Sequence, residues 1–434
     1  MHSYASKMIF EAQTSALMES GNTLIFFTDT FPCGKGETFI ENEFPFLARA
    51  FSRIIIVTNN LTEPVTRTVS QNTQVVRYNY QPQTPNKVKA LLAWFSAPLM
   101  HEREFLQQGL HLTLTRQRLT IMLSTYAKML ETETFLNQLA EQEHLDKSKL
   151  YLYAYWFNNL AASIAFYRSK YPQVKAFCRA HRWDIYAAEQ PGAYLPFRLF
   201  TLQHLNACFP ISDDGLAYLS RQTQHRANHH IRLARLGTTP PPIPLPSGNT
   251  DKVNLVSCSY IIPRKRLHLL VNALAAIDDI PLEWTHYGAG PAMEEIQALA
   301  TQKLAHKSNV VFRFAGQISN SELLQQYHRG NYDLFVNVSE SEGIPVSIME
   351  AISFGIPAIA TDTGGSREVV VENESGYLLP VQTNALQIAG AIRKFWLLTP
   401  ADKNKLRNKA HLFWDHRFNA RNNYPAFLSL LNGL

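Results

Sequence analysis

The chain has 434 residues, of which 46% are hydrophobic and 18% are charged, values typical of a globular protein with two or three domains. No apolar run reaches the roughly 18 residues of a membrane-spanning helix, and the stretch MHSYASKMIFEAQTS lacks the apolar core of a secretory signal, so we expect a cytoplasmic protein. The four cysteines are far apart without a C-x-x-C pair, which argues against a disulfide framework or a zinc site.

The net charge of +6 is unevenly distributed along the chain. Residues 51–250 contain 21 Lys and Arg against 12 Asp and Glu, a net charge of +9. Such an excess favours solubility, and it can also hold a protein peripherally at the anionic inner face of the cytoplasmic membrane. Both interpretations remain open. Nucleic acid is not an expected partner, because the chain has no recognisable nucleic-acid-binding motif.

After an expected loosely tethered extension over residues 1–20, the chain predicts a βαβ unit. Apolar runs at Leu24–Phe27 and Ile54–Val57 flank a helical stretch. The turn between them contains Gly34, Lys35 and Gly36. Glycines let the backbone approach a phosphate or sugar closely, and the lysine adds a positive charge. The alternative is an ordinary turn.

Residues 90–145 are rich in Leu, Met and aromatic residues at helical spacing, which predicts long helices. These helices either pack on the first sheet or present part of an apolar surface to lipid or a lipid-linked acceptor. Further on, His181 follows a predicted strand that ends near Cys178. A lone histidine is often structural, but the carboxyl end of a parallel strand is where open α/β sheets bind ligands.

A second domain is expected after the proline-rich linker Thr238–Thr250. Helical patterns separate six strand-like runs, which predicts a doubly wound sheet. The runs are NLVSCS, LEWTHYG, VVFRFAG, DLFVNVS, PAIATD and GYLLP. Loops expected at one edge of the sheet contain Arg264 and Lys265 after the first run, Gly290 after the second, and Gly316 and Ile318 after the third.

The stretch SESEGIPVSIME follows the fourth of these runs and predicts a strand, a turn and a buried helix. Pro345 suits the first helical position, and Gly355-Ile356-Pro357 supplies the end of the helix. Glu350 lies on a narrow polar stripe of this otherwise apolar helix. A carboxylate buried there needs hydrogen-bond donors, and the hydroxyl groups of a ligand could supply them.

Glu342 belongs to the turn at the carboxyl end of the strand, eight residues before Glu350. At ~1.5 Å per helical residue the two carboxylates are roughly 10 to 12 Å apart along the helix axis. Free amides at the helix start lie between them and favour an anion. This arrangement suits a nucleotide sugar. The alternative is a solvated helix N-terminus whose acidic residues lie near the helix dipole.

These residues resemble the signature of the retaining glycosyltransferases of family 4, which have the GT-B fold: an α/β fold with two Rossmann-like, doubly wound domains facing a central cleft. The resemblance rests on Ser339, Glu342, Glu350, Gly355 and Pro357, followed by PAIATDTGGSREVV. It assigns Glu342 to the donor sugar and Glu350 to the ribose hydroxyls. It also implies that the residues around them, at the strand end, the turn and the helix start, bind the donor. These residues are Ser339, Gly343, Ile344, Pro345 and Val346.

The resemblance extends to the other loops. It implies that the loop at Gly34, Lys35 and Gly36 faces the donor diphosphate, and that His181 lies beside the reacting centre. It implies that Lys265 binds the diphosphate and that the loop from Gly316 to Ile318 seats the base, with Gly290 in a further cleft loop. Family members often have an arginine five residues before the lysine. Tyr260 stands at that place here, and Arg264 or Arg266 is the candidate replacement.

The implied domains are an acceptor-side domain, residues 1–240 with a returning C-terminal helix at 415–434, and a nucleotide-sugar-binding domain, residues 251–414. The catalytic residues would be His181, Glu342 and Lys265. The cleft motifs contain no D-x-D pair, so we expect no metal cofactor.

We therefore expect a metal-independent, retaining hexosyltransferase. It would move a sugar from a UDP- or GDP-sugar to a lipid-linked saccharide or glycan in exopolysaccharide, O-antigen or lipopolysaccharide assembly. Two alternatives remain open. One is a UDP-sugar 2-epimerase of the same fold, and the other is a catalytically silent scaffold in a polysaccharide-assembly complex.

Overall fold

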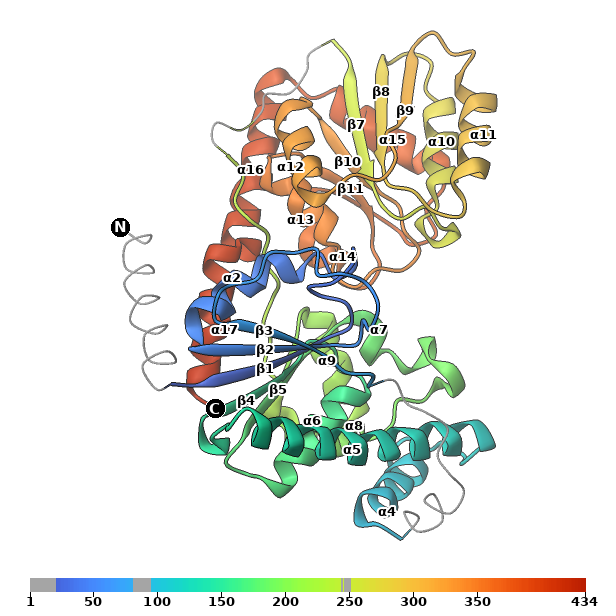
Figure 1. The fold of residues 1–434 in the computed structure, drawn as a ribbon. Coiled ribbons are helices and arrows are strands. Elements are labelled where there is room, and N and C mark those ends of the chain that lie inside the picture. Colours follow the sequence, from blue (N-terminus) through green and yellow to red (C-terminus); the bar gives the residue numbers. More distant parts are fainter. Residues whose placement is uncertain (1–20, 81–94, 243–244, 246–250) are drawn as a thin grey trace. The chain divides into compact units, whose positions relative to one another are not determined.

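The computed structural model describes residues 21–80, 95–242, 245 and 251–434. It consists of two compact units (Figure 1). The first comprises Met1–Arg235 and Tyr424–Leu434, and the second comprises Leu236–Asn423. The expected extension at 1–20 and most of the expected linker Thr238–Thr250 lie outside the described residues. Within the described ranges, no helix is both long enough and apolar enough to cross a membrane.

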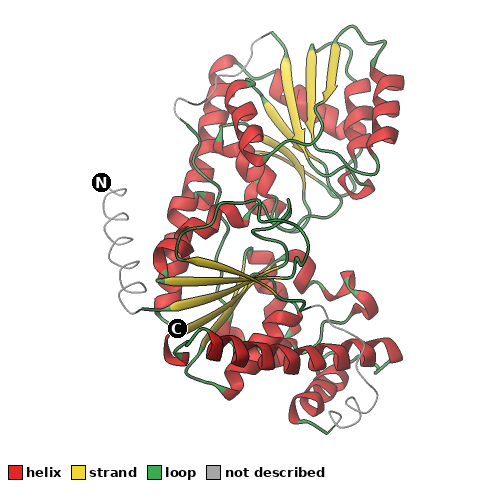
Figure 2. Ribbon diagram, in the orientation of Figure 1, coloured by secondary structure: helices red, strands yellow, loops and turns green. Residues whose placement is uncertain are grey.

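The first unit contains a parallel sheet with the strand order β3-β2-β1-β4-β5-β6. Its strands are β1 Thr23–Thr28, β2 Arg53–Thr58, β3 Thr73–Arg77, β4 Leu150–Ala154, β5 Lys175–Ala180 and β6 Ala207–Pro210. The predicted βαβ unit is confirmed, with α2 (Ile40–Ala50) between β1 and β2. Figure 2 shows the helices that flank this sheet.

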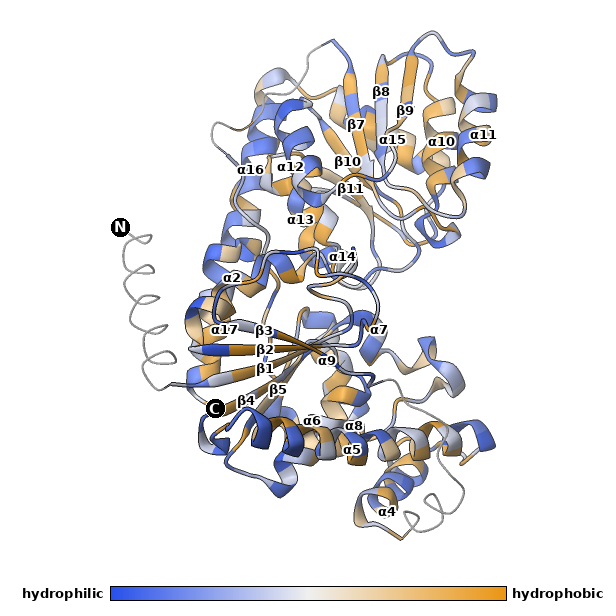
Figure 3. Ribbon diagram, viewed as in Figure 1, coloured by the Kyte–Doolittle hydropathy of each residue, from blue (hydrophilic) through white to orange (hydrophobic). Residues whose placement is uncertain are grey.

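Both faces of the first sheet are covered, which explains why its central strands are continuously hydrophobic. Ile25 and Phe27 of β1 enter one core cluster, whereas Leu24 and Phe26 enter another. The hydropathy colouring shows the central strands as predominantly apolar (Figure 3). The helices of this unit are α2, α4 Ala97–Glu104, α5 Arg116–Gln142, α6 Asn159–Lys170, α7 Arg182–Ile185, α8 Arg198–His204, α9 Asp213–Gln222 and most of α17 Ala420–Asn432.

The C-terminal helix α17 packs on the first sheet although it follows the second unit in the chain. Its side chains Phe427, Leu428 and Leu431 are buried in the same core cluster as Leu24 and Phe26 of β1. The chain therefore crosses between the units twice, first near Arg235 and again near Asn423.

The helices predicted over residues 90–145 are present wherever the structure describes this segment. A π-helical turn, Phe105–Gly109, continues α4, and α5 runs over 27 residues. The first part of α5 forms a small core with α4, in which Leu99, Leu106 and Met122 are buried. Its last turns reach the main core of the sheet through Leu136 and Leu139. Residues 81–94 lie outside the described ranges.

The second unit contains another parallel sheet, with the order β12-β11-β10-β7-β8-β9. All six predicted runs form strands: β7 Val253–Cys258, β8 Leu282–Tyr287, β9 Val310–Phe314, β10 Leu334–Asn337, β11 Ala358–Thr361 and β12 Gly376–Leu379. The helices are α10 Leu267–Ala275, α11 Met293–Leu304, α12 Asn320–Arg329, α13 Val346–Ser353, α14 Ser366–Val369, α15 Ala385–Trp396 and α16 Pro400–Phe418.

In the two units together, single 3₁₀ turns occur at Lys147–Lys149, Ala187–Glu189, Pro191–Ala193, Asn228–His230 and Pro263–Lys265.

Helix α13 begins one residue later than predicted. Pro345 has an extended backbone (φ −77°, ψ 96°) and precedes the helix instead of occupying its first position. Its carbonyl accepts hydrogen bonds from the amides of Ile348 (3.0 Å) and Met349 (3.3 Å), so it satisfies donors that the first turn leaves free. The helix ends before Gly355, which adopts a positive φ of 67°.

Candidate functional site

In the second unit, the predicted residues Lys265 and Glu342 are in direct contact. The Nζ atom of Lys265 lies 2.6 Å from Oε1 of Glu342, and both side chains are largely buried. Asn337, the last residue of β10, donates a second hydrogen bond of 3.2 Å to the same oxygen. This places a cation and a carboxylate together at the carboxyl edge of β7 and β10, the edge at which open α/β sheets bind ligands.

The backbone around Glu342 is held tightly at that edge. The amide of Gly365 donates to the carbonyl of Gly343 at 2.6 Å, and a Cβ atom at Gly365 would lie only 2.7 Å from that oxygen. Thr361 contributes a hydroxyl hydrogen bond to the carbonyl of Ser339. The turn that carries Glu342 is therefore fixed before any ligand arrives.

The two arginines considered as replacements for the missing one differ in their surroundings. Arg266 donates to the carbonyls of Val338 (2.7 Å), Ser339 (3.1 Å) and Val381 (2.7 Å). Its guanidinium therefore stabilises the segment that follows β10. Arg264 is exposed, and its guanidinium makes no hydrogen bond to the described part of the chain. The whole guanidinium of Arg264 is thus available for a diphosphate, whereas that of Arg266 already donates to three backbone carbonyls.

Glu350 lies on α13 and is 6% exposed. Burial raises the pKa of its carboxyl to about 7, although a hydrogen bond from Asn320 opposes the rise. The amide nitrogen of Asn320 lies 2.7 Å from Oε1 of Glu350. The sequence-based prediction missed Asn320. Its only sequence signal is its place at the start of α12, directly after the loop at Gly316 and Ile318.

The glycine loops after β8 and β9 approach other backbone segments closely. A Cβ atom at Gly288 would lie 2.0 Å from the carbonyl oxygen of Ser259, and one at Gly290 would lie 2.4 Å from that of Ile261. The amide of Gly288 donates to the carbonyl of Gly316 at 2.8 Å. No side chain fits between the backbones at Gly288 and Gly290, whereas a Cβ atom at Gly316 would meet nothing within 4 Å and that position favours glycine through its positive φ of 73°.

In the first unit, the predicted loop at Gly34, Lys35 and Gly36 is bent back by the next residue, Glu37. The carboxylate of Glu37 accepts hydrogen bonds from the backbone amides of Asp29 (3.1 Å), Thr30 (2.6 Å) and Phe31 (2.7 Å), at the end of β1. It also accepts one of 2.6 Å from the indole of Trp156. Glu37 has a positive φ of 54°, an uncommon conformation for this residue type.

Arg67 holds the same loop from the other side. Its guanidinium donates to the carbonyls of Cys33 (2.8 Å), Gly34 (2.7 Å) and Gly36 (2.6 Å). Lys35 remains exposed at the tip of the loop. The sequence predicted the loop but neither of the side chains that hold it, because their partners lie in other segments.

His181 follows β5 directly and is 6% exposed. Its ring packs against Trp156 (centroids 4.5 Å apart), Tyr155 (5.0 Å) and Phe39 (6.1 Å). Burial, with a smaller contribution from the charge of Arg179, lowers the pKa of His181 to about 3, so the ring is neutral at physiological pH. Its Nε2 atom is buried and has no hydrogen-bond partner among the described residues.

Asp184 orients the backbone on which His181 lies. One carboxylate oxygen accepts from the amide of His181 and the other from that of Phe157, both at 2.7 Å. Arg198 donates to the carbonyls of Phe157 and Asp184 and completes the bridge between the ends of β4 and β5. Burial raises the pKa of Asp184 to about 7.

The structure thus brings together Lys265 with Glu342 in the second unit, where Asn320 holds Glu350. In the first unit it links the Gly34–Gly36 loop to His181 through Glu37 and Trp156. No group of three or more His, Cys, Asp or Glu within the described ranges is arranged to hold a metal ion. The second unit can bind hydroxyl groups through two carboxylates and an anion through Lys265.

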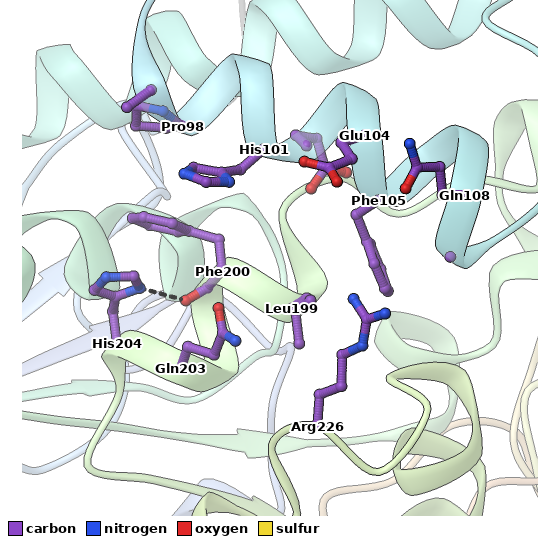
Figure 4. A pocket seen from close by; sticks show the side chains of 13 residues that line it. Pro98, His101, Glu104, Phe105, Gln108, Leu199, Phe200, Gln203, His204 and Arg226 are labelled. Carbon is purple, nitrogen blue, oxygen red and sulfur yellow. Dashed lines mark hydrogen bonds between the residues drawn. The ribbon is translucent and has the colours of Figure 1, made fainter.

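A separate pocket of about 520 Å³ lies in the first unit between α4 and α8 (Figure 4). Phe105, Phe200 and Leu199 contribute apolar surface, and Arg226 approaches from a neighbouring turn. None of the predicted site residues lines this pocket.

Comparison with known proteins relates the chain to a family. Residues 246–412 match the model of the family described as glycosyl transferases group 1. This match covers most of the second unit. The putative colanic acid biosynthesis glycosyltransferase WcaL of Escherichia coli (strain K12) is 24% identical over 265 residues, which is 58% of this chain and 63% of that protein.

A second relative is the GtfA subunit of the UDP-N-acetylglucosamine–peptide N-acetylglucosaminyltransferase of Streptococcus agalactiae. It is 29% identical over 147 residues, which is 33% of this chain and 28% of that protein. The chain therefore matches less than two thirds of the length of either relative.

Solved structures share the fold over 95% of the chain. The apo form of the lipopolysaccharide outer core galactosyltransferase WaaB has a TM-score of 0.65 at 13% identity, over 95% of this chain and all of that one. Alr3699/HepE of Anabaena in complex with UDP and glucose has a TM-score of 0.60 at 14% identity, over 95% of this chain and all of that one. The fold class is GT-B, as predicted. The family match itself is limited to residues 246–412.

Proposed function

We propose that the protein is a retaining glycosyltransferase of family 4 that transfers a hexose from a UDP- or GDP-sugar to a lipid-linked saccharide or glycan acceptor. The reaction would serve cell-surface polysaccharide biosynthesis in the cytoplasm, at the inner face of the membrane. The observation that carries this proposal is the contact of Lys265 with Glu342 at the edge of the second sheet, with Glu350 buried on the helix that follows. The likeness to WcaL, a putative colanic acid biosynthesis glycosyltransferase, supports it.

In this proposal the donor replaces interactions that the protein makes with itself. Lys265 leaves Glu342 and binds the diphosphate, while Glu342 binds hydroxyl groups of the sugar. The amides at the start of α13, near Gly343 to Val346, supply further donors for the diphosphate. Glu350 exchanges its hydrogen bond from Asn320 for hydroxyl groups of the ribose. The complex of HepE with UDP and glucose supports a nucleotide-sugar donor.

The proposed chemistry needs no metal ion. As the bond between the anomeric carbon and the leaving phosphate oxygen breaks, Lys265, Arg264 and helix amides stabilise the negative charge that develops on the diphosphate. The acceptor hydroxyl attacks on the face that the phosphate leaves and passes its proton to a phosphate oxygen. His181 is neutral and contributes by hydrogen bonding and orientation, so it is not a nucleophile.

A nucleotide-sugar panel tests the proposal. Thermal unfolding would be followed with UDP-, GDP- and ADP-sugars, since a ligand that binds only the folded state raises the apparent stability by mass action. We expect a UDP- or GDP-sugar to raise the melting temperature of the wild type, and Glu350→Gln to reduce the rise. Absence of a response to every nucleotide sugar would contradict the proposal and favour a silent scaffold. Conversion of the sugar without an acceptor would indicate an epimerase.

A further inference from the structure

Trp183 is a large apolar side chain that remains 42% exposed on α7. Its indole packs on that of Trp156, with ring centroids 5.2 Å apart and the planes inclined by 56°. Trp156 follows the carboxyl end of β4, and Trp183 follows that of β5. The two rings form an aromatic surface, the Trp156/Trp183 platform, at the edge of the sheet where ligands bind in this class of fold.

The platform is held in place without a ligand. The indole N–H of Trp156 donates to Glu37 at 2.6 Å, and its ring packs against His181 and Phe39. Glu37 is fixed in turn by three backbone amides at the end of β1. Because these contacts already order the rings, a ligand that stacks on them would lose little further conformational entropy on binding.

Polar side chains flank Trp183 in the chain. Arg182 forms an ion pair of 2.5 Å with Glu189, and both side chains are partly exposed. The side chain of Gln190 donates to the carbonyl of Trp183. A pyranose has an apolar face of C–H groups and an edge of hydroxyls, so it needs an aromatic surface with donors and acceptors at its rim.

The platform disfavours the other common stacking ligand, a nucleotide. A nucleobase can stack on indole rings, but a phosphate that approached the backbone amides at the end of β1 would meet the carboxylate of Glu37, which already accepts their hydrogen bonds. Repulsion between like charges makes that approach unfavourable. A neutral sugar ring has no such conflict.

We propose that the Trp156/Trp183 platform binds a pyranose ring of the acceptor saccharide by stacking. This inference rests on the proposed transferase function and names the chemistry with which the first unit would hold the acceptor. Trp183 provides the accessible ring face, and Trp156 and Glu37 are positioning residues that keep that face in place.

Indole NMR signals of the full-length protein test the platform without requiring turnover. The chain has six tryptophans, so ¹⁵N-labelled protein gives six indole N–H signals, and Trp→Phe variants assign those of Trp156 and Trp183. The probes are methyl α-D-glucopyranoside, methyl β-D-galactopyranoside, methyl α-D-mannopyranoside and the methyl β-glycoside of N-acetylglucosamine. We expect at least one probe to shift the signals of Trp156 and Trp183 in a saturable manner and to leave the other four unchanged.

Matched variants separate stacking from general perturbation. Trp183→Ala should weaken binding of that glycoside about tenfold, the equivalent of an aromatic contact of roughly 1.4 kcal/mol. Phe95→Ala serves as the control, because Phe95 is 76% exposed in the same unit and has no contact with the platform. The proposal is overturned if no glycoside shifts Trp183, if both variants weaken binding equally, or if UDP alone shifts the platform signals.

Donor binding measured on the same samples separates this inference from the proposed function. If a nucleotide sugar raises the melting temperature but no glycoside shifts the indole signal of Trp183, the platform proposal is wrong and the transferase proposal stands. If glycosides shift Trp183 but no nucleotide sugar binds, the first unit binds saccharide and the transferase proposal fails.

Discussion

Lys265, Glu342 and Glu350 of the proposed donor site each have a partner inside the protein. The ammonium of Lys265 is neutralised by Glu342, and the carboxyl of Glu350 is held by Asn320. A donor must therefore compete with these internal contacts, and the effect of a substitution depends on which partner it sets free. Glu342 and Lys265 are in direct contact, and we therefore expect their substitutions to affect diphosphate affinity differently.

Glu342→Ala should leave the affinity for bare UDP or GDP unchanged or raise it, because the substitution releases Lys265 for the diphosphate. Lys265→Ala should weaken the same binding by about 1.5–3 kcal/mol, the usual contribution of a hydrogen bond to a charged group. Isothermal titration with the two variants measures both effects. Equal losses of affinity would show that the lysine and the glutamate do not have separate ligands.

The raised pKa of Glu350 predicts that nucleotide affinity depends on pH. Its carboxyl has a pKa of about 7 in the empty site, whereas the ribose hydroxyls donate best to the ionised form. Below pH 7 the carboxyl must lose a proton before it can accept both hydroxyls, which costs about 1.4 kcal/mol for each pH unit. Affinity should thus rise about tenfold between pH 6 and pH 8.

Glu350→Gln serves as the control, because it cannot ionise and should show only the pH dependence of the nucleotide phosphate itself. Titrations of UDP or GDP at several pH values compare the two proteins. A wild-type curve parallel to that of the variant would mean that Glu350 does not change its protonation state when the nucleotide binds.

At the scale of elements, the segment between β1 and α2 is ordered by one carboxylate. Glu37 satisfies the amides of Asp29, Thr30 and Phe31 and also orients Trp156. Burial raises the pKa of Asp29 to about 6, and the nearby charge of Glu37 makes a smaller contribution in the same direction. The side chain of Glu37 therefore holds both the segment after β1 and the segment after β4 in place.

Glu37→Gln should loosen this segment, because an amide offers one oxygen where the carboxylate offers two, and its NH₂ group would face donors. We expect the amides of Thr30 and Phe31 to exchange their hydrogens faster by about one order of magnitude, the equivalent of roughly 1.4 kcal/mol of local stability. Hydrogen exchange followed by mass spectrometry measures this effect. Glu104→Gln, a substitution at an exposed position of α4, should change nothing there.

The strands and the site elements differ in how far the sequence predicts them. The apolar runs predict all six strands of the second sheet. Burial on both faces leaves an almost unbroken hydrophobic run in β10 and β11, whereas the edge strand β9 contains exposed residues at alternate positions. The apolar pattern between Pro345 and Gly355 likewise predicts a helix. By contrast, Asn320, Glu37 and Arg266 act through contacts between segments distant in the chain, and local patterns carry no information about such partners.

At the scale of the molecule, the charge is concentrated in one part of the chain. Residues 51–250 have a net charge of +9, and most of them belong to the first unit. A basic surface is attracted to acidic lipids by roughly 1 kcal/mol for each lysine or arginine near the membrane. This is a physical reason for the proposed location at the inner face of the membrane.

Vesicle flotation tests the membrane contact. The protein should float with vesicles that contain phosphatidylglycerol at low ionic strength and should dissociate as salt is raised, because the Debye length falls to about 8 Å at 0.15 M. Vesicles of phosphatidylcholine alone are the control. Binding to neutral vesicles only, or no flotation with acidic vesicles at low salt, would remove the electrostatic basis of the location.

The central claim is a metal-independent transfer with retention at the anomeric carbon, and the configuration of the product tests it most directly. The wild type would be incubated with the nucleotide sugar that stabilises it, detergent-solubilised lipid-linked saccharides and excess EDTA, and the new linkage would be read from NMR coupling constants. We predict a product with the anomeric configuration of the donor, formed at the same rate with and without EDTA. An inverted product, or activity that EDTA abolishes and Mg²⁺ or Mn²⁺ restores, would contradict the account.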